Sequence, residues 1–187
     1  MNRNHVGFPL VTLCALIALF GAGCSTVPDT AELPRAFTGK VVSVHDGDTI
    51  VVMVGSNQQF RVRLAEIAAP DMEQAYGTES KRTLADKVRG KTVRVTVAGV
   101  DDAGLPMGVI YLGDRGINWE MVAEGAAWQY RRYSRNGALA DAERQAREKH
   151  LGLWADKNPV PPWVYRNPRP IEPPSEAHPE PLIRFGW

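Results

Sequence analysis

The sequence predicts an α+β fold, a small, partly open five-stranded β-barrel of OB type with about three helices. Short segments with the composition and alternation of β-strands recur between residues 41 and 112. A helical pattern separates the third of these segments from the fourth, and two more helical patterns follow the fifth. Short strands around one inserted helix are the layout of a small barrel, and the later helices would cover one side of it.

The strand predictions depend on β-branched residues and on alternation of polar and apolar side chains. Alternation places Arg61 and Arg63 on one face of the third strand, because side chains two residues apart leave a strand on the same side. Glu66 would fall on the apolar face, so this strand is expected to end or bulge there. The predicted strands are Val41–Val44, Thr49–Val54, Gln59–Leu64, Thr92–Val97 and Met107–Leu112.

The helix predictions depend on apolar residues at helical spacing and on glycines that end each segment. Leu84 and Val88 fall on one side of the first helix, and Gly90 follows it. Gly152 is expected just after the last helix, where a left-handed residue commonly ends the helical hydrogen bonding. The predicted helices are Thr78–Arg89, Ile117–Glu124 and Leu139–His150.

The N-terminus has the pattern of a bacterial lipoprotein signal. Arg3 precedes an apolar run, Val11–Phe20, which is followed by small residues and Cys24. The run is short for a transmembrane helix, which needs about 20 apolar residues. Residues 1–23 are therefore predicted to be a signal peptide and Cys24 to be lipidated. A secretory signal with an incidental cysteine is the alternative.

The rest of the chain divides into three parts. Residues 24–36 are predicted to be the lipidated cysteine and a tether, residues 37–155 the barrel domain, and residues 156–187 a proline-rich tail. Proline lacks a backbone N–H donor, so regular structure is not expected in the tail, although Trp163 and Tyr165 could fold back onto the domain. These boundaries imply a cell-envelope protein held on a membrane, and the prediction is the outer membrane, facing the periplasm or the surface.

Composition limits the possible partners. The net charge is +1, so a site for nucleic acid must be a local basic patch rather than a basic surface over the whole molecule. The two cysteines, Cys14 and Cys24, both lie near the N-terminus and leave no disulfide for the domain. The chain is expected to be a monomer.

The residues with a chemical role are expected between Val44 and Asp71. An acidic turn, Asp46-Gly47-Asp48, precedes the second strand, and a second turn, Ala69-Pro70-Asp71, follows the third. Arg61 and Arg63 lie about 6.6–7 Å apart on the strand between them, which a phosphodiester could span. Carboxylates beside arginines can hold a metal ion and a phosphate together. A tight turn next to a solvated strand face is the simpler explanation.

An ordered set of motifs resembles the staphylococcal-nuclease-like (thermonuclease) domain. Each motif is weak alone, but their order extends over about 120 residues. The resemblance implies an OB-type barrel and Ca²⁺-dependent hydrolysis of DNA and RNA. The matching residues are Val44-x-Asp46-Gly47-Asp48-Thr49, Arg63-Leu64-Ala65-x-Ile67-x-Ala69-Pro70, Tyr76-Gly77, Ile117-Asn118, Gly125-x-Ala127-Trp128 and Gly152-Leu153-Trp154.

The resemblance also assigns roles to individual positions. It implies that Asp48 is a metal-binding carboxylate and that the backbone carbonyl of Ala69 is a further ligand. It implies that Arg63 binds the phosphate and stabilises its developing charge, and that Asp71 is the catalytic carboxylate.

Three positions depart from the family pattern. Ala68 stands where a second metal-binding aspartate is expected, and Asp71 is one methylene shorter than the family's glutamate. Leu105 stands where the second catalytic arginine is expected. Loss of one charge-stabilising donor typically costs about 10²–10³-fold in rate. Calcium binding is therefore expected to be weak and hydrolysis slow or lost.

Other residues could compensate or add binding. Arg61 and Arg115 are possible replacements for the missing arginine, and Glu66 and Asp46 for the missing oxygen ligand. Tyr133, which lies near several arginines, could stack on a base. Spacing alone does not show that any of these side chains reaches the site.

Three functions follow as hypotheses. The first is a membrane-anchored nuclease-like domain that binds nucleic-acid or nucleotide phosphates, with weak or lost hydrolysis. The second is an active Ca²⁺-dependent endonuclease, acting on DNA and RNA with rearranged ligands. The third is an envelope scaffold that recruits a partner through its proline-rich tail.

Overall fold

The computed structural model describes residues 34–167. The predicted signal peptide, Cys24, most of the tether and the tail beyond Asn167 lie outside this range. The buried hydrophobic residues extend from Val41 to Trp154, so the described part contains its own core. Among these residues, no helix combines the length and the apolarity that a membrane crossing requires.

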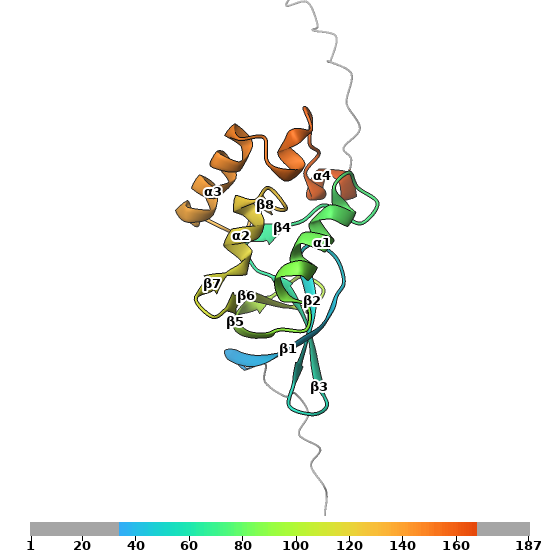
Figure 1. The fold of residues 1–187 in the computed structure, drawn as a ribbon, viewed down its shortest axis with the longest axis vertical. Coiled ribbons are helices and arrows are strands. Elements are labelled where there is room, and N and C mark those ends of the chain that lie inside the picture. The colour runs from blue at the N-terminus through green and yellow to red at the C-terminus, as the bar shows by residue number, and fades with distance from the viewer. Residues whose placement is uncertain (1–33, 168–187) are drawn as a thin grey trace, which may run out of the picture. The chain divides into compact units, whose positions relative to one another are not determined.

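Five long strands form a barrel (Figure 1), which confirms the predicted fold class, although the barrel is closed where a partly open one was expected. The strands pair in the order β3-β2-β1-β5-β6, and the short β7 pairs with β6. The barrel closes where β3 runs parallel to β6, with Arg63 opposite Met107 and Leu64 opposite Gly108. The long strands are β1 (Ala36–Val44), β2 (Thr49–Val54), β3 (Gln58–Leu64), β5 (Thr92–Val100) and β6 (Pro106–Leu112).

The strand ends differ from the sequence prediction where pairing between distant segments extends a strand. β1 begins at Ala36 because residues 36–40 pair with residues 92–96 of β5. Glu66 has a φ of 66°, so β3 ends before it, as its place on the apolar face suggested. Three two-residue strands were not predicted, because two residues are too few for an alternation pattern. They are β4 (Ile67–Ala68), β7 (Arg115–Gly116) and β8 (Trp128–Gln129).

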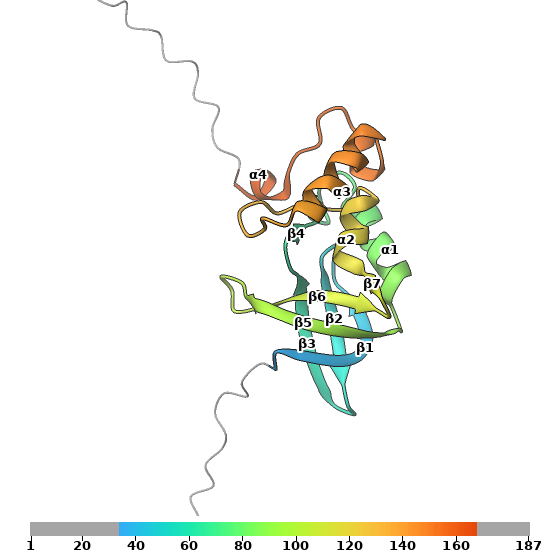
Figure 2. The same cartoon turned by 90° about the vertical axis from the view of Figure 1, so that its left-hand side faces the viewer.

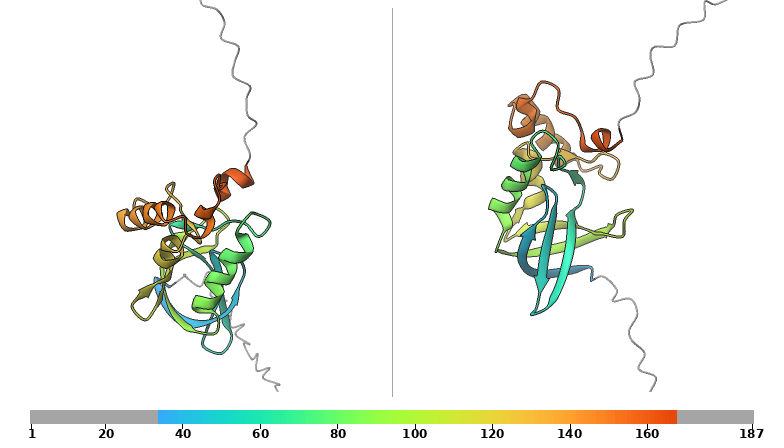
Figure 3. Two further views of the ribbon diagram at one scale, coloured as in Figure 1. Left: turned by 45° about the horizontal axis from the view of Figure 1, so that its top comes forward. Right: turned by 90° about the vertical axis from the view of Figure 1, so that its right-hand side faces the viewer.

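The helices gather at one end and one side of the barrel (Figure 2, Figure 3). The three predicted helices are present, and none of their ends is shifted by more than two residues. α2 packs against α3, and α1 contacts both β1 and α2. The helical elements are α1 (Gly77–Val88), α2 (Ile117–Ala123), α3 (Gly137–Glu148), the 3₁₀ turn η1 (Gly152–Ala155) and α4 (Pro162–Arg166).

The helix α4 contradicts the expectation that the proline-rich tail lacks regular structure. Pro161 and Pro162 stand at the start of this helix, where a missing N–H costs nothing and a fixed φ favours helical geometry. Trp163 then packs against Trp128 and Tyr130, with ring centroids 5.7 Å and 5.2 Å away. The tail thus returns to the domain, as Trp163 suggested, and it does so as a helix.

Asn118 fixes the segment after β3 against β6. The residue is 4% exposed, and its Oδ1 accepts a hydrogen bond from the Ile110 N–H at 2.9 Å. Its Nδ2 donates to the carbonyls of Ala65 at 2.8 Å and Gly108 at 3.2 Å. A buried amide that satisfies three backbone groups holds two segments in one register. This contact positions the turn that leads to Ala69 and Asp71.

Candidate functional site

The acidic turn packs tightly against α1. The Asp48 N–H donates to Asp46 Oδ1 at 2.9 Å, which keeps the turn compact. A Cβ at Gly47 would collide with Ser80 Oγ and Ala69 Cβ, so only glycine allows this approach. The turn therefore presents Asp48 directly beside the segment that follows β4.

Asp48 is buried, and its negative charge is only partly compensated by neighbouring groups. It is 5% exposed, and its two oxygens accept hydrogen bonds from Thr49 Oγ1 at 3.0 Å and from the Ala69 N–H at 2.9 Å. Burial, with a smaller contribution from the nearby charge of Asp46, raises the pKa of Asp48 to about 6. The Ala69 N–H and Arg63 oppose that shift. Because burial and Asp46 outweigh these two groups, the carboxylate of Asp48 is stabilised when it binds a proton or a cation.

Arg63 lies between two aspartates. Its Nη1 donates to Asp101 Oδ2 at 2.7 Å, and its Nε lies 3.7 Å from Asp48 Oδ1. That Nε is buried and has no hydrogen-bond partner among the described residues. Asp101 is held in turn by the N–H groups of Ala103 and Leu105, which donate to its Oδ1 at 3.0 and 2.8 Å. The sequence analysis assigned no chemical role to Asp101.

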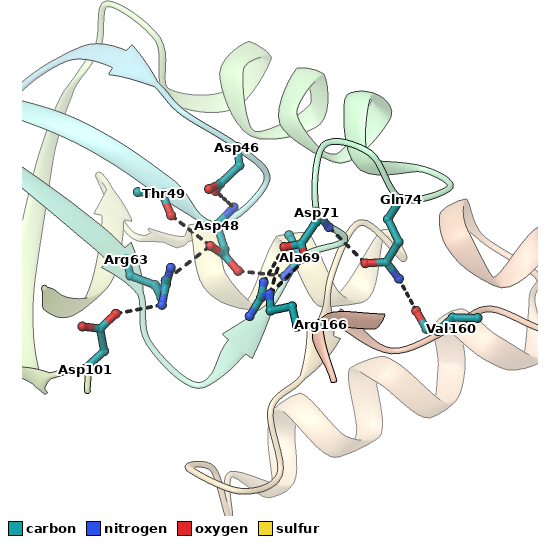
Figure 4. Close-up of polar contacts among 10 residues, drawn as sticks. All are labelled: Asp46, Asp48, Thr49, Arg63, Ala69, Asp71, Gln74, Asp101, Val160 and Arg166. Atoms are coloured by element: carbon teal, nitrogen blue, oxygen red, sulfur yellow. Dashed lines mark hydrogen bonds and ion pairs between the residues drawn. The ribbon is translucent and has the colours of Figure 1, made fainter. Parts of the chain in front are cut away.

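Asp71 is paired with an arginine from the far end of the described chain (Figure 4). Arg166, the last residue of α4, donates from Nε to both Asp71 oxygens at 3.1 and 3.0 Å, and from Nη2 to Oδ1 at 2.6 Å. These hydrogen bonds raise the pKa of Arg166, and the charges of Asp48 and Asp46 contribute to the shift. Its guanidinium thus lies within electrostatic reach of the acidic turn. Sequence analysis did not single out Arg166.

A pocket of about 250 Å³ adjoins this cluster. Arg63 and Arg166 both line it, together with the aromatic rings of Tyr130 and Tyr133. The tyrosine rings are in edge contact, with centroids 5.0 Å apart. Leu105 and Arg61 are not among the lining residues. The remaining lining residues are Leu64, Glu66, Ile67, Val100, Asp101, Asp102, Ala103 and Met107.

The suggested replacements have other partners. Arg115 pairs with Glu120 at 2.7 and 2.6 Å on β7 and α2. Glu66 lines the pocket, but its oxygens accept hydrogen bonds from Ser134 at 3.1 Å and Asn136 at 3.3 Å. Arg61 lies opposite Val51 of the neighbouring strand β2 and does not line the pocket. Tyr133 is 47% exposed at the pocket, so its predicted stacking role stays a prediction.

The donor set is too small for a calcium site of the usual kind. Ca²⁺ takes six to eight oxygen ligands. Asp48 is the one buried carboxylate here, Asp71 is paired with Arg166, and Ala68 offers no side-chain oxygen. Within residues 34–167, no group of three or more His, Cys, Asp or Glu side chains could hold a metal ion together. The residues present therefore do not fit the calcium ion that the motifs implied.

Fold and site together define a small barrel protein with a pocket lined by two arginines, three carboxylates and two tyrosines. Residues 61–156 match the family model of staphylococcal nuclease homologues. This chain therefore belongs to the staphylococcal nuclease family, whose members are phosphodiester hydrolases that generally depend on Ca²⁺.

Several relatives match most of the chain. An "Uncharacterized endonuclease" of Haemophilus influenzae is 38% identical over 162 residues, which cover 87% of this chain and 86% of that protein. A "Micrococcal nuclease" of Shigella flexneri is 42% identical over 141 residues, covering 70% of this chain and 80% of that protein. "Protein ParB" of Escherichia coli is 37% identical over 150 residues, covering 74% and 82%.

Proposed function

We propose that this chain binds the phosphodiester backbone of nucleic acid at the pocket lined by Arg63, and hydrolyses it far more slowly than a complete site would. The observation that carries the proposal is the position of Arg63. Its side chain is 37% exposed at a pocket that also contains the rings of Tyr130 and Tyr133. Guanidinium groups bind phosphate oxygens and aromatic rings stack on bases. The printed names of the relatives, endonuclease and micrococcal nuclease, support nucleic acid as the ligand.

Slow hydrolysis is expected because the site lacks a metal ligand, a second arginine at its usual position and a free catalytic carboxylate. Ala68 removes a metal-binding oxygen, and Leu105 provides no positive charge at the pocket. Asp71 is shortened and its carboxylate is paired with Arg166. Removal of one charge-stabilising donor typically lowers a catalytic rate by about 10²–10³-fold. Together these changes favour binding over rapid cleavage.

The test measures binding and cleavage separately with residues 25–187, which contain the whole described core. Binding of a fluorescein-labelled single-stranded DNA is followed by anisotropy at low salt in EDTA, and cleavage of DNA and RNA is followed with and without Ca²⁺. We expect salt-sensitive binding that Arg63→Ala abolishes, and cleavage close to background. Arg61→Ala is the matched comparison, because Arg61 lies on the same strand but outside the pocket.

The results also separate the alternatives. Rapid Ca²⁺-dependent cleavage that Asp48→Ala abolishes would overturn slow hydrolysis and establish an active endonuclease with rearranged ligands. Retention of Asp48 and Arg63 is the observation that favours this second function. Absence of any binding would overturn the phosphate-binding proposal, and the scaffold role of the proline-rich tail would then be the one to pursue.

We propose in addition that Cys24 is lipidated and holds the chain on a membrane of the cell envelope. The sequence from Arg3 to Cys24 supports this anchor. The outer membrane is the expected location, because Ser25 replaces the acidic residue that often retains lipoproteins at the inner membrane. We also propose that the chain is a monomer.

A further inference from the structure

Arg166 reaches the site from a segment that is remote in sequence. Its ion pair with Asp71 joins residues 95 positions apart. The guanidinium contacts the carboxylate through Nε and Nη2, in the forked geometry that arginine also uses with phosphate. Neither of these contacts uses Nη1, and no residue between 34 and 167 hydrogen-bonds to it, so within this range it is a donor for a second anionic group. The side chain is 44% exposed, so a ligand can approach it.

The segment before Arg166 is held firmly enough to position it. Gln74 donates from Nε2 to the Val160 carbonyl at 2.5 Å and accepts from the Asp71 N–H at 3.1 Å. The same side chain thus joins the Asp71 turn to the segment that carries α4. Trp163 stacks on Tyr130 with an interplanar angle of 17°. A side chain mounted on a fixed element loses little further entropy when it binds.

Arg63 and Arg166 approach one pocket from different elements, β3 and α4. Leu105 lies in the loop between β5 and β6 and does not line the pocket. The pocket therefore has two guanidinium groups although the expected position of the second arginine is occupied by leucine. The carboxylates of Asp101, Asp102 and Glu66 also line it, and they accept hydrogen bonds from Arg63, Tyr133 and Ser134. Because these carboxylates already have partners, the two guanidinium groups at a space of about 250 Å³ are the groups that could bind a phosphodiester with an adjacent sugar or base.

We propose that Arg166 is a second phosphate-binding arginine of this site, supplied by α4 in place of the one missing at Leu105. The inference rests on the proposed phosphate-binding function of the pocket. In the absence of nucleic acid Arg166 is paired with Asp71, and a bound phosphate shares or takes over that guanidinium. A purely structural ion pair, which would only hold α4 in place, is the competing explanation.

The first measurement compares two arginine variants of residues 25–187. Binding of the labelled single-stranded DNA is measured by anisotropy over a range of salt concentrations in EDTA. Arg166→Gln is expected to weaken binding about tenfold, the loss of one charged hydrogen bond. The slope of log K against log salt should fall in magnitude by about 0.7, the value for one phosphate contact on a single strand. Arg144→Gln is the control, because Arg144 pairs with Asp141 and Glu148 on the surface of α3 and should leave both values unchanged.

The second measurement separates phosphate binding from a structural role. Asp71→Asn breaks the same ion pair but leaves Arg166 free and removes a negative charge beside the pocket. We expect Asp71→Asn to bind the DNA as tightly as the parent or more tightly, whereas Arg166→Gln binds less tightly. A structural ion pair predicts instead that both variants lose affinity equally, with matching losses in unfolding midpoint. Equal losses would overturn the proposal.

The remaining outcomes are also decisive. If Arg63→Ala loses binding while Arg166→Gln retains it, the role of Arg166 is refuted and the phosphate-binding function stands. If Arg166→Gln binds more tightly than the parent, Arg166 obstructs the pocket and the proposal is refuted. If the parent binds no DNA, both the proposed function and the role of Arg166 fail together.

Discussion

The carboxylate of Asp48 is a buried charge that the fold compensates incompletely. Its pKa is about 6 in the folded chain, against an ordinary value of 3.8. Because the folded value is the higher one, ionisation of Asp48 costs the folded state more than the unfolded state. The stability linked to this group is therefore fully present below about pH 4 and is lost as the pH rises through about 6. The total loss is about 3 kcal/mol, since one pKa unit corresponds to about 1.4 kcal/mol.

We therefore expect Asp48→Asn to stabilise the domain at neutral and alkaline pH. The amide keeps an oxygen for the Ala69 N–H and removes the buried charge. Urea unfolding at about pH 8 should show a free energy of unfolding about 2–3 kcal/mol above that of the parent, and at about pH 4 the two should agree.

The control for this measurement is Asp86→Asn, a carboxylate exposed on α1, which should change stability little at either pH. A variant no more stable than the parent at about pH 8 would show that a bound cation compensates Asp48 in solution. Repeating the comparison in EDTA would then identify a metal as the compensating charge.

Some site residues could be predicted from local spacing and others could not. Asp48 and Arg63 stand in a short motif, so the sequence predicted that they would lie near each other. Asp101 lies 38 residues from its partner Arg63, and Arg166 lies 95 residues from its partner Asp71. No periodic pattern in the sequence indicates a pairing over such a distance. A proline-rich tail also gave no reason to expect a helix that carries a functional arginine. Charge pairs between distant segments are set by the closed barrel and not by local sequence.

At the scale of elements, Asn118 holds α2, β6 and the segment after β3 together. Its amide makes hydrogen bonds with three backbone groups, those of Ile110, Ala65 and Gly108. We expect Asn118→Ala to lower the free energy of unfolding by about 2–4 kcal/mol, because buried backbone groups lose their partners. Urea unfolding followed by tryptophan fluorescence measures the change.

Gln145→Ala is the matched control, because Gln145 is an amide exposed on α3 and its removal should change stability by less than about 0.5 kcal/mol. Loss of DNA binding in Asn118→Ala under conditions where the variant is folded would show that the Asp71 turn depends on this bridge. An Asn118→Ala chain as stable as the parent would contradict the role assigned to the amide.

The docking of α4 also makes a prediction at this scale. Trp163 is half-buried against Trp128 and Tyr130, so Trp163→Ala should lower the free energy of unfolding by about 1–2 kcal/mol. The same variant should weaken DNA binding, because Arg166 is no longer held at the pocket. Anisotropy and urea unfolding measure the two effects on one sample.

Val164→Ala is the comparison for α4, because Val164 is 45% exposed on the same helix. It should leave both quantities close to those of the parent. If Trp163→Ala lost stability but kept its full affinity for DNA, α4 would be a structural helix with no part in the pocket.

Helices and strands could be predicted where the segment was long enough to show a repeating pattern of apolar residues. Each of the five long strands and the three longer helices was predicted, because burial on one side imposes alternation or helical spacing. β4 and β8 pair with each other through Ile67, Ala68, Trp128 and Gln129, which are too few to show any pattern. The extension of β1 to Ala36 depends on pairing with β5, which becomes visible only when the barrel closes.

At the scale of the whole molecule, closure of the barrel assembles the site. Asp48 precedes β2, Arg63 is the penultimate residue of β3 and Asp101 follows β5. The parallel contact between β3 and β6 brings these strand ends together. The folded domain therefore needs no strong overall charge to form the proposed phosphate site. A net charge of +1 is consistent with a local site and with little long-range attraction of nucleic acid.

The full-length chain leads to a prediction about location. If Cys24 carries acyl chains, the protein should sediment with membranes and incorporate labelled palmitate, because each buried methylene contributes about 0.8 kcal/mol to membrane binding. Cys24→Ser should abolish the label. Cys14→Ser is the matched control, because Cys14 lies inside the apolar run that lipoprotein processing would remove.

The behaviour of Cys24→Ser also shows what else could hold the chain on a membrane. A soluble, unlabelled Cys24→Ser protein would establish lipidation as the anchor and would place the pocket of Arg63 and Arg166 near a membrane surface. A parent chain that is soluble and unlabelled would contradict the lipoprotein prediction and favour an ordinary secretory signal. A Cys24→Ser chain that stays with the membrane unlabelled would point to the uncleaved run Val11–Phe20 as a second means of attachment, since that run remains when processing at Cys24 is blocked.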